Sequence, residues 1–332
     1  MSHHTDPDES VRAVLEGDRK AVAKFITKLE SSLPKDLKHA RKQLESILHH
    51  TGRSMRIAVS GAPGVGKSTF IESFGLHLIE KDHKVAVLAI DPSSPLTGGS
   101  ILGDKTRMHQ LSRHPQAFIR PSPASGVLGG VARKTRETVL VCEAAGFDTI
   151  LVETVGVGQS EIEAASMVDL FVLLLQPHGG DELQGIKKGI LEMADLVLIN
   201  KADGTLKQEA ERTLREFRSA LSYTSVTEDI TNPDFLSCSA LHRQGLDVVF
   251  ESLLKKKEMF QKTGTWEKKR KQQQKHWLKM MIQDELQFRF ESQPNLKDKI
   301  EILVEEVVSQ KKLPSTVADD LVEEWIMENK GP

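Results

Sequence analysis

The sequence predicts an α/β fold in which helices cover both faces of a mostly parallel β-sheet, with a helical extension at each end of the chain. Between residues 55 and 241, short apolar and β-branched runs alternate with helical stretches, and such runs are typical of parallel strands buried on both faces. Outside this region, apolar residues recur at helical spacing instead. We therefore expect a helical extension at 1–54, an α/β domain at 55–263 and a helical arm at 264–332.

The N-terminal extension is expected to form three helices. Residues 7 to 50 repeat apolar residues at helical spacing. Gly17 is expected to end the first helix, Asp18 to cap the second and Pro34 to begin the third, because each of these residue types is favoured at that helix position.

Six strands are expected in the α/β domain. They are the apolar runs at residues 55–60, 84–90, 148–153, 169–175, 195–200 and 234–240. After Gly245 the pattern is helical to the end of the chain. Interruptions of this pattern are expected at Gly264, Pro294 and Pro314.

Charge is unevenly distributed along the helical arm and the helix before it. Residues 251–276 carry nine Lys or Arg against three Asp or Glu, whereas residues 284–328 carry five against twelve. These charges fit either two solvated helix faces or an arm that pairs with a second subunit.

The composition is that of an ordinary globular protein. Of the 332 residues, 39% are hydrophobic and 28% are charged, and the formal net charge of −2 leaves no basic excess for binding nucleic acid. Cys142 and Cys238 form no CxxC pair that would indicate a zinc or redox motif. No apolar run approaches the roughly 20 residues of a membrane span, and the N-terminal residues lack the apolar segment of a signal peptide. We therefore expect a cytoplasmic protein with no nucleic-acid or membrane partner.

A glycine-rich loop between the first expected strand and the next helix carries a phosphate-binding pattern. Residues 61–68 fit GxxxxGK followed by Ser, in the strand–loop–helix context that this motif requires. The glycines let a phosphate chain approach the backbone N–H groups at the start of the helix. Lys67 is expected to neutralise phosphate charge, and the Ser68 hydroxyl to coordinate Mg²⁺; the alternative is a glycine-rich turn without a ligand. The residues expected to contact the nucleotide here are Gly61, Ala62, Pro63, Gly64, Val65, Gly66, Lys67, Ser68 and Thr69.

A second motif indicates which base is bound. Asn200, Lys201 and Asp203 form an NKxD pattern directly after an apolar strand. An Asp carboxylate in this pattern accepts both the ring N–H and the exocyclic amine of guanine, a donor pair that adenine does not present. The segment Ser239, Ala240 and Leu241 is expected to offer backbone N–H groups to the guanine oxygen. GTP is therefore favoured over ATP, although an isolated NKxD can also be a polar loop.

Acidic residues at the carboxyl ends of two strands predict a metal site. Asp91 and Glu153 follow strands, where open α/β sheets place their ligands, and Asp104 lies in a glycine-rich loop. Mg²⁺ prefers such oxygen ligands. The alternatives are helix caps for the first two and an ordinary loop acid for Asp104. Glu153 also opens an ExxG pattern whose Gly156 is expected to meet a γ-phosphate and to release it on hydrolysis.

The residue that would position the attacking water is not evident. Gln159 lies six residues after Glu153, and no arginine stands out as a finger. We therefore expect slow intrinsic hydrolysis that a partner accelerates. The loop at residues 179–188 is expected either to be a further moving segment or to be a simple β–α connection.

Several motifs together resemble the MeaB/ArgK-type GTPases, whose human relative is the methylmalonic aciduria type A protein. The resemblance covers nearly the whole chain and is weakest after residue 265. It implies a P-loop GTPase of the signal-recognition-particle/MinD/BioD class that is a homodimer through its C-terminal helices and a chaperone of adenosylcobalamin-dependent acyl-CoA mutases, above all methylmalonyl-CoA mutase. The motifs are "TGRSMRIAVSGAPGVGKST", "AIDPSSPLTGGSILGDKTRM", "ILVETVGVGQSE", "QPHGGDELQGIKKG" and "LINKADG".

Carried onto this sequence, the resemblance implies GTP or GDP and Mg²⁺ as ligands. The phosphate loop is Gly61 to Ser68, guanine is read by the NKxD motif, and residues 179–188 form a switch that responds to the mutase. The residues expected to act in hydrolysis are Lys67, Asp104 and Glu153, and those expected around the metal are Ser68, Asp91, Asp104 and Glu153.

Other functions remain open from the sequence. An ATP- or GTP-dependent kinase linked to amino-acid transport, and a scaffold that needs no hydrolysis, are both compatible with the motifs. Nickel-inserting GTPases commonly carry His-rich tracts or CxxC ligands, whereas the 12 histidines here are largely scattered. MinD/ParA-like ATPases carry an additional lysine where this chain has Ala62. Which mutase is served is also open.

Overall fold

The protein is represented by a computed structural model. It describes residues 9–31, 33–90, 108–121, 128–154, 159–177, 188–222, 232–293 and 296–328. The chain divides into two compact units, residues 1–273 and 274–332. The division falls inside the long helix α13 (Thr265–Glu291).

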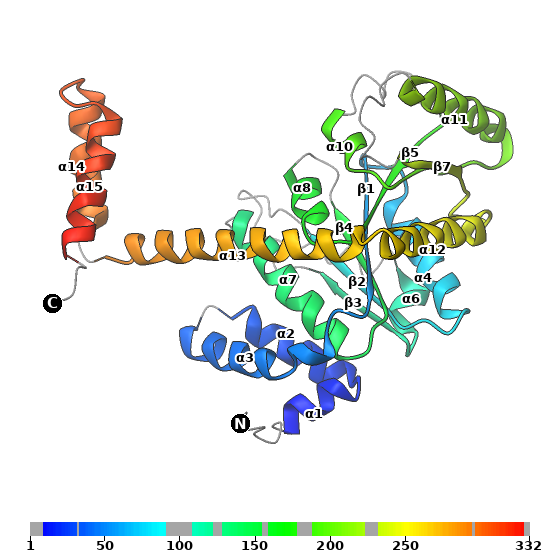
Figure 1. Cartoon of the computed structure of the whole chain (residues 1–332), viewed down its shortest axis with the longest axis horizontal. Helices are drawn as coiled ribbons and strands as arrows, with labels where there is room; N and C mark the ends of the chain where they lie inside the picture. The colour runs from blue at the N-terminus through cyan, green and yellow to red at the C-terminus, as the bar shows by residue number, and fades with distance from the viewer. Residues whose placement is uncertain are drawn as a thin grey trace. The chain divides into compact units, whose positions relative to one another are not determined.

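The first unit contains a seven-stranded sheet in the order β3-β2-β4-β1-β5-β6-β7 (Figure 1). Every pairing in it is parallel, which confirms the predicted α/β class. All carboxyl ends therefore meet at one edge of the sheet. The strands are β1 (Met55–Gly61), β2 (Val85–Ile90), β3 (Ala117–Pro121), β4 (Thr149–Thr154), β5 (Leu170–Leu175), β6 (Leu196–Ile199) and β7 (Asp234–Ser237).

Strand β3 is the one that the apolar pattern does not reveal. Its apolar part is only three residues long, and Pro121 ends it. A strand with a neighbour on one side only needs no continuous apolar run and tolerates proline at its end. The last strand is also shorter than expected: it stops at Ser237, and Ser239 instead forms an isolated antiparallel bridge with Gln244.

Helices cover both faces of the sheet. Successive strand residues point to opposite faces, and both faces carry apolar side chains that need to be buried. Ala58 packs in one hydrophobic cluster, whereas its neighbours Ile57 and Val59 pack in the other. The first cluster includes α1 (Glu9–Leu15), α2 (Arg19–Leu29), α3 (Pro34–Ser46), α7 (Leu128–Ala144), α8 (Gln159–Ala165), α10 (Lys188–Glu192) and α11 (Lys207–Ser222). The second includes α4 (Lys67–Ile79), α6 (His109–Arg113), α12 (Leu246–Lys262) and the start of α13.

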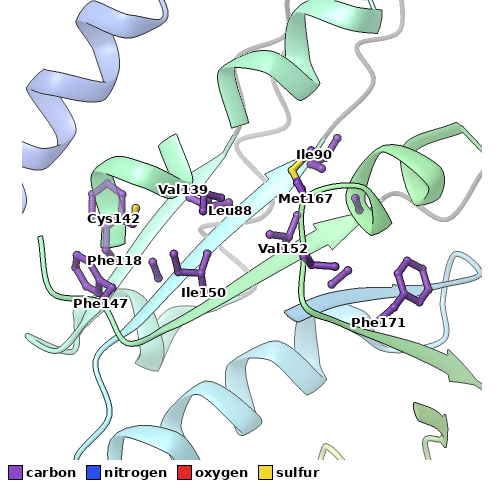
Figure 2. Packing of buried hydrophobic residues seen from close by; sticks show 14 of the residues in the cluster. Leu88, Ile90, Phe118, Val139, Cys142, Phe147, Ile150, Val152, Met167 and Phe171 are labelled. Carbon is purple, nitrogen blue, oxygen red and sulfur yellow. The ribbon is translucent and has the colours of Figure 1, made fainter. Parts of the chain in front are cut away.

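Figure 2 shows the first of these clusters from close by. Leu88 and Ile90 of β2 lie beside Ile150 and Val152 of β4, and all four are buried. Cys142 of α7 is fully buried in the same cluster, and burial raises the pKa of its thiol far above the usual range. This thiol is therefore a packing residue and not a nucleophile.

Gly17, Asp18 and Pro34 lie at the helix boundaries that the sequence predicts for them. Gly17 has φ +80° after α1, and the Asp18 carboxylate accepts a hydrogen bond of 2.6 Å from the Ala21 N–H at the start of α2. Pro34 occupies the first turn of α3. Phe25 and Ile26 of α2 are buried in the same cluster as the sheet, so these helices share the core of the first unit. The described part of the unit also contains two 3₁₀ turns, η1 (Leu48–His50) and η2 (Gly204–Leu206).

The second unit contains the later part of α13 with α14 (Leu296–Val308) and α15 (Pro314–Glu328). Phe290 meets Trp325 edge to face at 5.7 Å between ring centroids, and Lys299 pairs with Glu324. Many large apolar side chains of this unit are at least 44% exposed: Leu278, Ile282, Leu286, Phe288, Ile302, Val304, Val308, Leu313, Val322, Ile326 and Met327. Of the helices that the structure describes, none combines the length and the hydrophobicity that crossing a membrane requires.

Candidate nucleotide-binding site

The predicted phosphate loop connects the end of β1 to the start of α4, at the carboxyl edge of the sheet. Two of its positions leave no room for a side chain. A Cβ at Gly61 would clash with the Leu174 carbonyl oxygen, and one at Gly66, where φ is +95°, would lie 2.7 Å from Asn200 Nδ2. The glycines therefore allow both the sharp turn and the close approach of the β6 loop.

The loop is arranged to receive an anion. Lys67 Nζ donates to the carbonyl oxygens of Gly61 at 2.7 Å and Ala62 at 3.2 Å, so the ammonium group lies over the loop itself. Helix α4 is 13 residues long and begins directly after Gly66, which has no side chain to cap the first N–H groups. These N–H groups and the lysine can thus bind phosphate oxygens.

Ser68 and Glu153 meet beside this loop. The Ser68 hydroxyl donates a 2.9 Å hydrogen bond to Glu153 Oε1, and the Glu153 side chain is buried at the end of β4. The parallel register places Val59 of β1 opposite Glu153. A hydroxyl and a carboxylate beside a phosphate loop are hard oxygen donors, and such a pair fits Mg²⁺.

Three residues predicted for this metal and phosphate site lie outside the described part of the chain: Asp91, Asp104 and Gly156. Their expected roles stay predictions. The backbone leading to the first of them is described: Ile90, the last residue of β2, is in register with Thr154 of β4.

Asn200 joins the two motifs that the sequence singles out. Its side chain is 2% exposed. Nδ2 donates to the Val65 carbonyl oxygen at 2.9 Å, and Oδ1 accepts from the Ala240 N–H at 3.1 Å. Cys238 Sγ lies 3.6 Å from the same Oδ1. The phosphate loop, the NKxD motif and residues 238–240 therefore form one hydrogen-bonded structure.

The other two residues of the motif lie on either side of this connection. Lys201 has φ +59°, and its Nζ donates to the Gly64 carbonyl oxygen at 2.7 Å. One carboxylate oxygen of Asp203 accepts a hydrogen bond from the Ser239 hydroxyl. Because this side chain is 28% exposed, the carboxylate can both be held in place and receive the N–H groups of a base.

Two side chains beside Asp203 have contacts that the sequence does not predict. His242 Nε2 lies 4.0 Å from Asp203 Oδ1. Ser239 is predicted to act through its backbone N–H, whereas its hydroxyl contacts the base-reading carboxylate. A serine in a short loop carries no sequence signal for such a contact, because the contact depends on how β6 and β7 pair. Leu241, which is predicted to act through its backbone, has a side chain that is 73% exposed.

The replacement Asn200→Ala is expected to destabilise the protein as well as to weaken nucleotide binding. It leaves the Val65 carbonyl and the Ala240 N–H buried without this partner, and each such group costs about 1–3 kcal/mol. The free energy of unfolding in urea, measured without nucleotide, should fall accordingly. Asn200→Asp retains the acceptor for Ala240 but places a buried carboxylate oxygen against the Val65 carbonyl oxygen, so its loss should be at least as large. An unchanged unfolding midpoint in the alanine variant would show that the hydrogen bonds of the Asn200 side chain do not stabilise the fold.

Comparisons with known proteins give the family. The family model described as "Methylmalonyl Co-A mutase-associated GTPase MeaB" matches residues 22–295. A putative GTPase of Caulobacter vibrioides is 48% identical over 315 residues, which cover 95% of this chain and 96% of that protein. GTPase ArgK of Escherichia coli is 46% identical over 278 residues, which cover 84% of each chain.

Two further similarities cover almost the whole chain. The mitochondrial "Methylmalonic aciduria type A homolog" of Mus musculus is 42% identical over 325 residues, which cover 95% of this chain and 78% of that protein. The crystal structure of a protein named "LAO/AO transport system kinase" has a TM-score of 0.76 and 34% identity, and the match covers 98% of this chain and 99% of that one. On this evidence, together with the phosphate loop and the NKxD motif, the chain belongs to the MeaB family of P-loop GTPases.

Proposed function

We propose that this protein is a GTP-hydrolysing chaperone of an adenosylcobalamin-dependent acyl-CoA mutase, with methylmalonyl-CoA mutase as the partner. Its role is to gate the loading of the cofactor and to protect or reactivate the mutase. The observation that carries the proposal is the family match over residues 22–295, because the family description names association with this mutase. One relative is named for methylmalonic aciduria, and this name points to the same methylmalonyl group as the name of the mutase does.

The residues of the site divide into two groups in this proposal. The loop from Gly61 to Thr69 holds the phosphates, with Lys67 as the cation that neutralises the charge developing on them. Asp203 reads guanine, with its carboxylate oriented by Ser239. Asn200 and Lys201 hold the phosphate loop and the base-reading residues at a fixed separation, because they donate to the carbonyl oxygens of Val65 and Gly64.

Ser68 and Glu153 would hold Mg²⁺, together with Asp91 and Asp104. The ion supplies neutralisation of phosphate charge when it is bound. The hydrogen bond from the Ser68 hydroxyl to Glu153 Oε1 already orients the two side chains toward each other. Gly156 follows Glu153 by three residues and is proposed to sense the γ-phosphate through its N–H.

Slow hydrolysis without a partner is part of this proposal. Gln159, the first glutamine after Glu153, is the first residue of helix α8. GTPases that hydrolyse rapidly place a glutamine to orient the attacking water or supply an arginine to the transferring phosphate. A partner that supplies or positions such a group would therefore raise the rate, as a chaperone cycle requires.

The second unit is proposed to join two copies of the chain. Leu278, Ile282 and Leu286 recur at intervals of four on α13, and each is about half-exposed or more. Apolar side chains gathered in this way are typical of interaction surfaces. Light scattering coupled to gel filtration should accordingly give about twice the chain mass of 36.9 kDa.

A second candidate function follows from the similar crystal structure, whose protein is named as a transport system kinase. Such a kinase would transfer a phosphoryl group to an acceptor protein and would show no dependence on a mutase. In the described part of the chain, no three His, Cys, Asp or Glu side chains gather to hold a metal ion, so nothing there favours a metal-delivery role.

The proposal is tested by the association of the full chain with methylmalonyl-CoA mutase. Gel filtration of the mixture is carried out with GDP and then with a non-hydrolysable GTP analogue, each with Mg²⁺. We expect a complex whose affinity differs between the two nucleotides. Elution of the two proteins as separate species under both conditions would contradict the proposal, and labelling of an amino-acid transport protein from radioactive ATP would support the kinase.

A further inference from the structure

Helix α8, which begins at Gln159, is the first described element after strand β4, which carries Glu153. Its first turn is connected to the strand that leads into the phosphate loop. The Glu161 side chain is 1% exposed, and its Oε1 lies 3.5 Å from the hydroxyl of Ser60, the residue before Gly61. A displacement at the phosphate site that moves the end of β1 would therefore be transmitted to α8 through this contact.

The other end of α8 is held by side chains of α7 and of α13. Arg136 Nη2 of α7 donates to the Ser166 hydroxyl at 2.6 Å. Gln273 Nε2 of α13 donates to the carbonyl oxygens of Val168 at 2.7 Å and Ala165 at 3.4 Å. Arg136 Nη1 also donates to the Gln273 carbonyl oxygen at 3.3 Å. We call the side chains of Arg136, Ser166 and Gln273, with the carbonyls of Ala165 and Val168, the α8–α13 junction.

The junction is buried enough to be sensitive to small displacements. Arg136 is 6% exposed. Burial, followed by the nearby charge of Arg56, lowers the pKa of Arg136 to about 10, and Glu163 partly offsets this effect. The guanidinium therefore remains protonated at neutral pH and keeps its donors. Hydrogen bonds to a charged, buried donor depend strongly on geometry, so a displacement of α8 would break them.

One turn before the junction, α13 is fixed to the amino-terminal ends of the strands. Arg270 donates two hydrogen bonds of 2.7 Å to Asp169, the residue directly before β5, and donates to the Ser54 carbonyl oxygen at 2.6 Å. Lys269 Nζ donates to the Asp169 carbonyl oxygen at 2.6 Å and lies 3.6 Å from Asp195 Oδ2. These contacts hold the base of α13 to the sheet without involving α8.

Gln273 is thus placed between a fixed helix base and the helix that follows the phosphate site. It is also the last residue of the first unit, and α13 continues from it into the second. We propose that the α8–α13 junction is a latch that couples nucleotide state to α13, with Arg136 and Gln273 as positioning residues that favour one position of α8. By reciprocity, anything that alters α13 beyond Gln273 then alters the preference between GDP and GTP.

This inference rests on the proposed nucleotide site but not on the identity of the partner protein. Its test is the affinity of the full chain for GDP and for a non-hydrolysable GTP analogue, measured by calorimetry with Mg²⁺. Gln273→Ala is expected to change the ratio of the two affinities by about fivefold or more, the lower end of typical allosteric coupling. Ser166→Ala, which removes the acceptor for Arg136 and the hydroxyl's own bond to the Glu163 carbonyl oxygen but leaves both Gln273 contacts, should change it in the same direction and less.

Lys269→Ala is the matched control, because Lys269 lies on the same helix and contacts the strand ends but not α8. It should leave the ratio unchanged. Hydrogen exchange of residues 159–168 should differ between the two nucleotides in the unmodified chain, and this difference should shrink in Gln273→Ala. An unchanged ratio and an unchanged exchange difference in both junction variants would overturn the latch alone. Failure of the unmodified chain to bind either nucleotide would overturn the nucleotide site and the latch together.

Discussion

Lys67→Ala is expected to lower GTP hydrolysis by about 10²- to 10³-fold, the usual loss when one preorganised group facing the developing charge is removed. The Lys67 ammonium lies over the loop, where it donates to the carbonyl oxygens of Gly61 and Ala62. A bound phosphate chain would take over these donors without a large rearrangement of the side chain. Alanine provides neither charge nor donor, so both the binding of the nucleotide and the transition state lose this stabilisation.

The matched control is Lys81→Ala. Lys81 follows the C-terminal end of α4, whereas Lys67 begins it, and its Nζ lies 3.3 Å from Asp247 Oδ1, away from the phosphate loop. Turnover is measured as phosphate release at saturating GTP and Mg²⁺, and folding by circular dichroism. The control should keep normal turnover. A folded Lys67→Ala variant with turnover within about threefold of the unmodified chain would be inconsistent with the proposed role of the loop.

Asp203→Asn is expected to convert the base preference from guanine to xanthine. The Asp203 carboxylate accepts two N–H groups of guanine in the proposed site, whereas an asparagine amide offers one acceptor and one donor group. Xanthine carries a carbonyl in place of the exocyclic amine, so it matches the amide and repels the carboxylate. GTP affinity should therefore fall by a factor approaching about 10⁴, the discrimination that sites built to bond an N–H achieve.

The affinities of both proteins, unmodified and Asp203→Asn, for GTP and xanthosine triphosphate are the measurement. Ser239→Ala serves as the comparison, because it removes the hydroxyl that bonds Asp203 but leaves the carboxylate. It should weaken GTP binding without creating affinity for xanthosine triphosphate. If Asp203→Asn bound neither GTP nor xanthosine triphosphate, this residue would hold the loop together and would not read the base.

The sequence predicts most of the fold because the buried strands are nearly continuous apolar runs. Residues 170–175 of β5 are all apolar and all buried, which leaves little ambiguity. Residues 117–121 give no such signal, because an edge strand pairs on one side only and Arg120 and Pro121 interrupt its apolar pattern. The three-part division of the chain stays a prediction.

The candidate site is predictable in its motifs but not in its connections. Lys67 and Asp203 stand in patterns whose chemistry follows from residue type and spacing. The bond from Asn200 to Val65 links residues 135 positions apart, and no local pattern encodes a contact of that kind. Arg136 and Gln273 are polar residues on helices, which are normally solvated, and only tertiary packing buries the former beside the end of α8.

In the proposed function, GTP hydrolysis by this chain is coupled to a mutase. The most direct measurement is the turnover of GTP and of ATP by the purified protein, first alone and then with methylmalonyl-CoA mutase. We expect slow turnover of GTP in preference to ATP, with a marked rise in the GTP rate when the mutase is added. Preference for ATP, or a GTP rate that no adenosylcobalamin-dependent mutase changes, would contradict it.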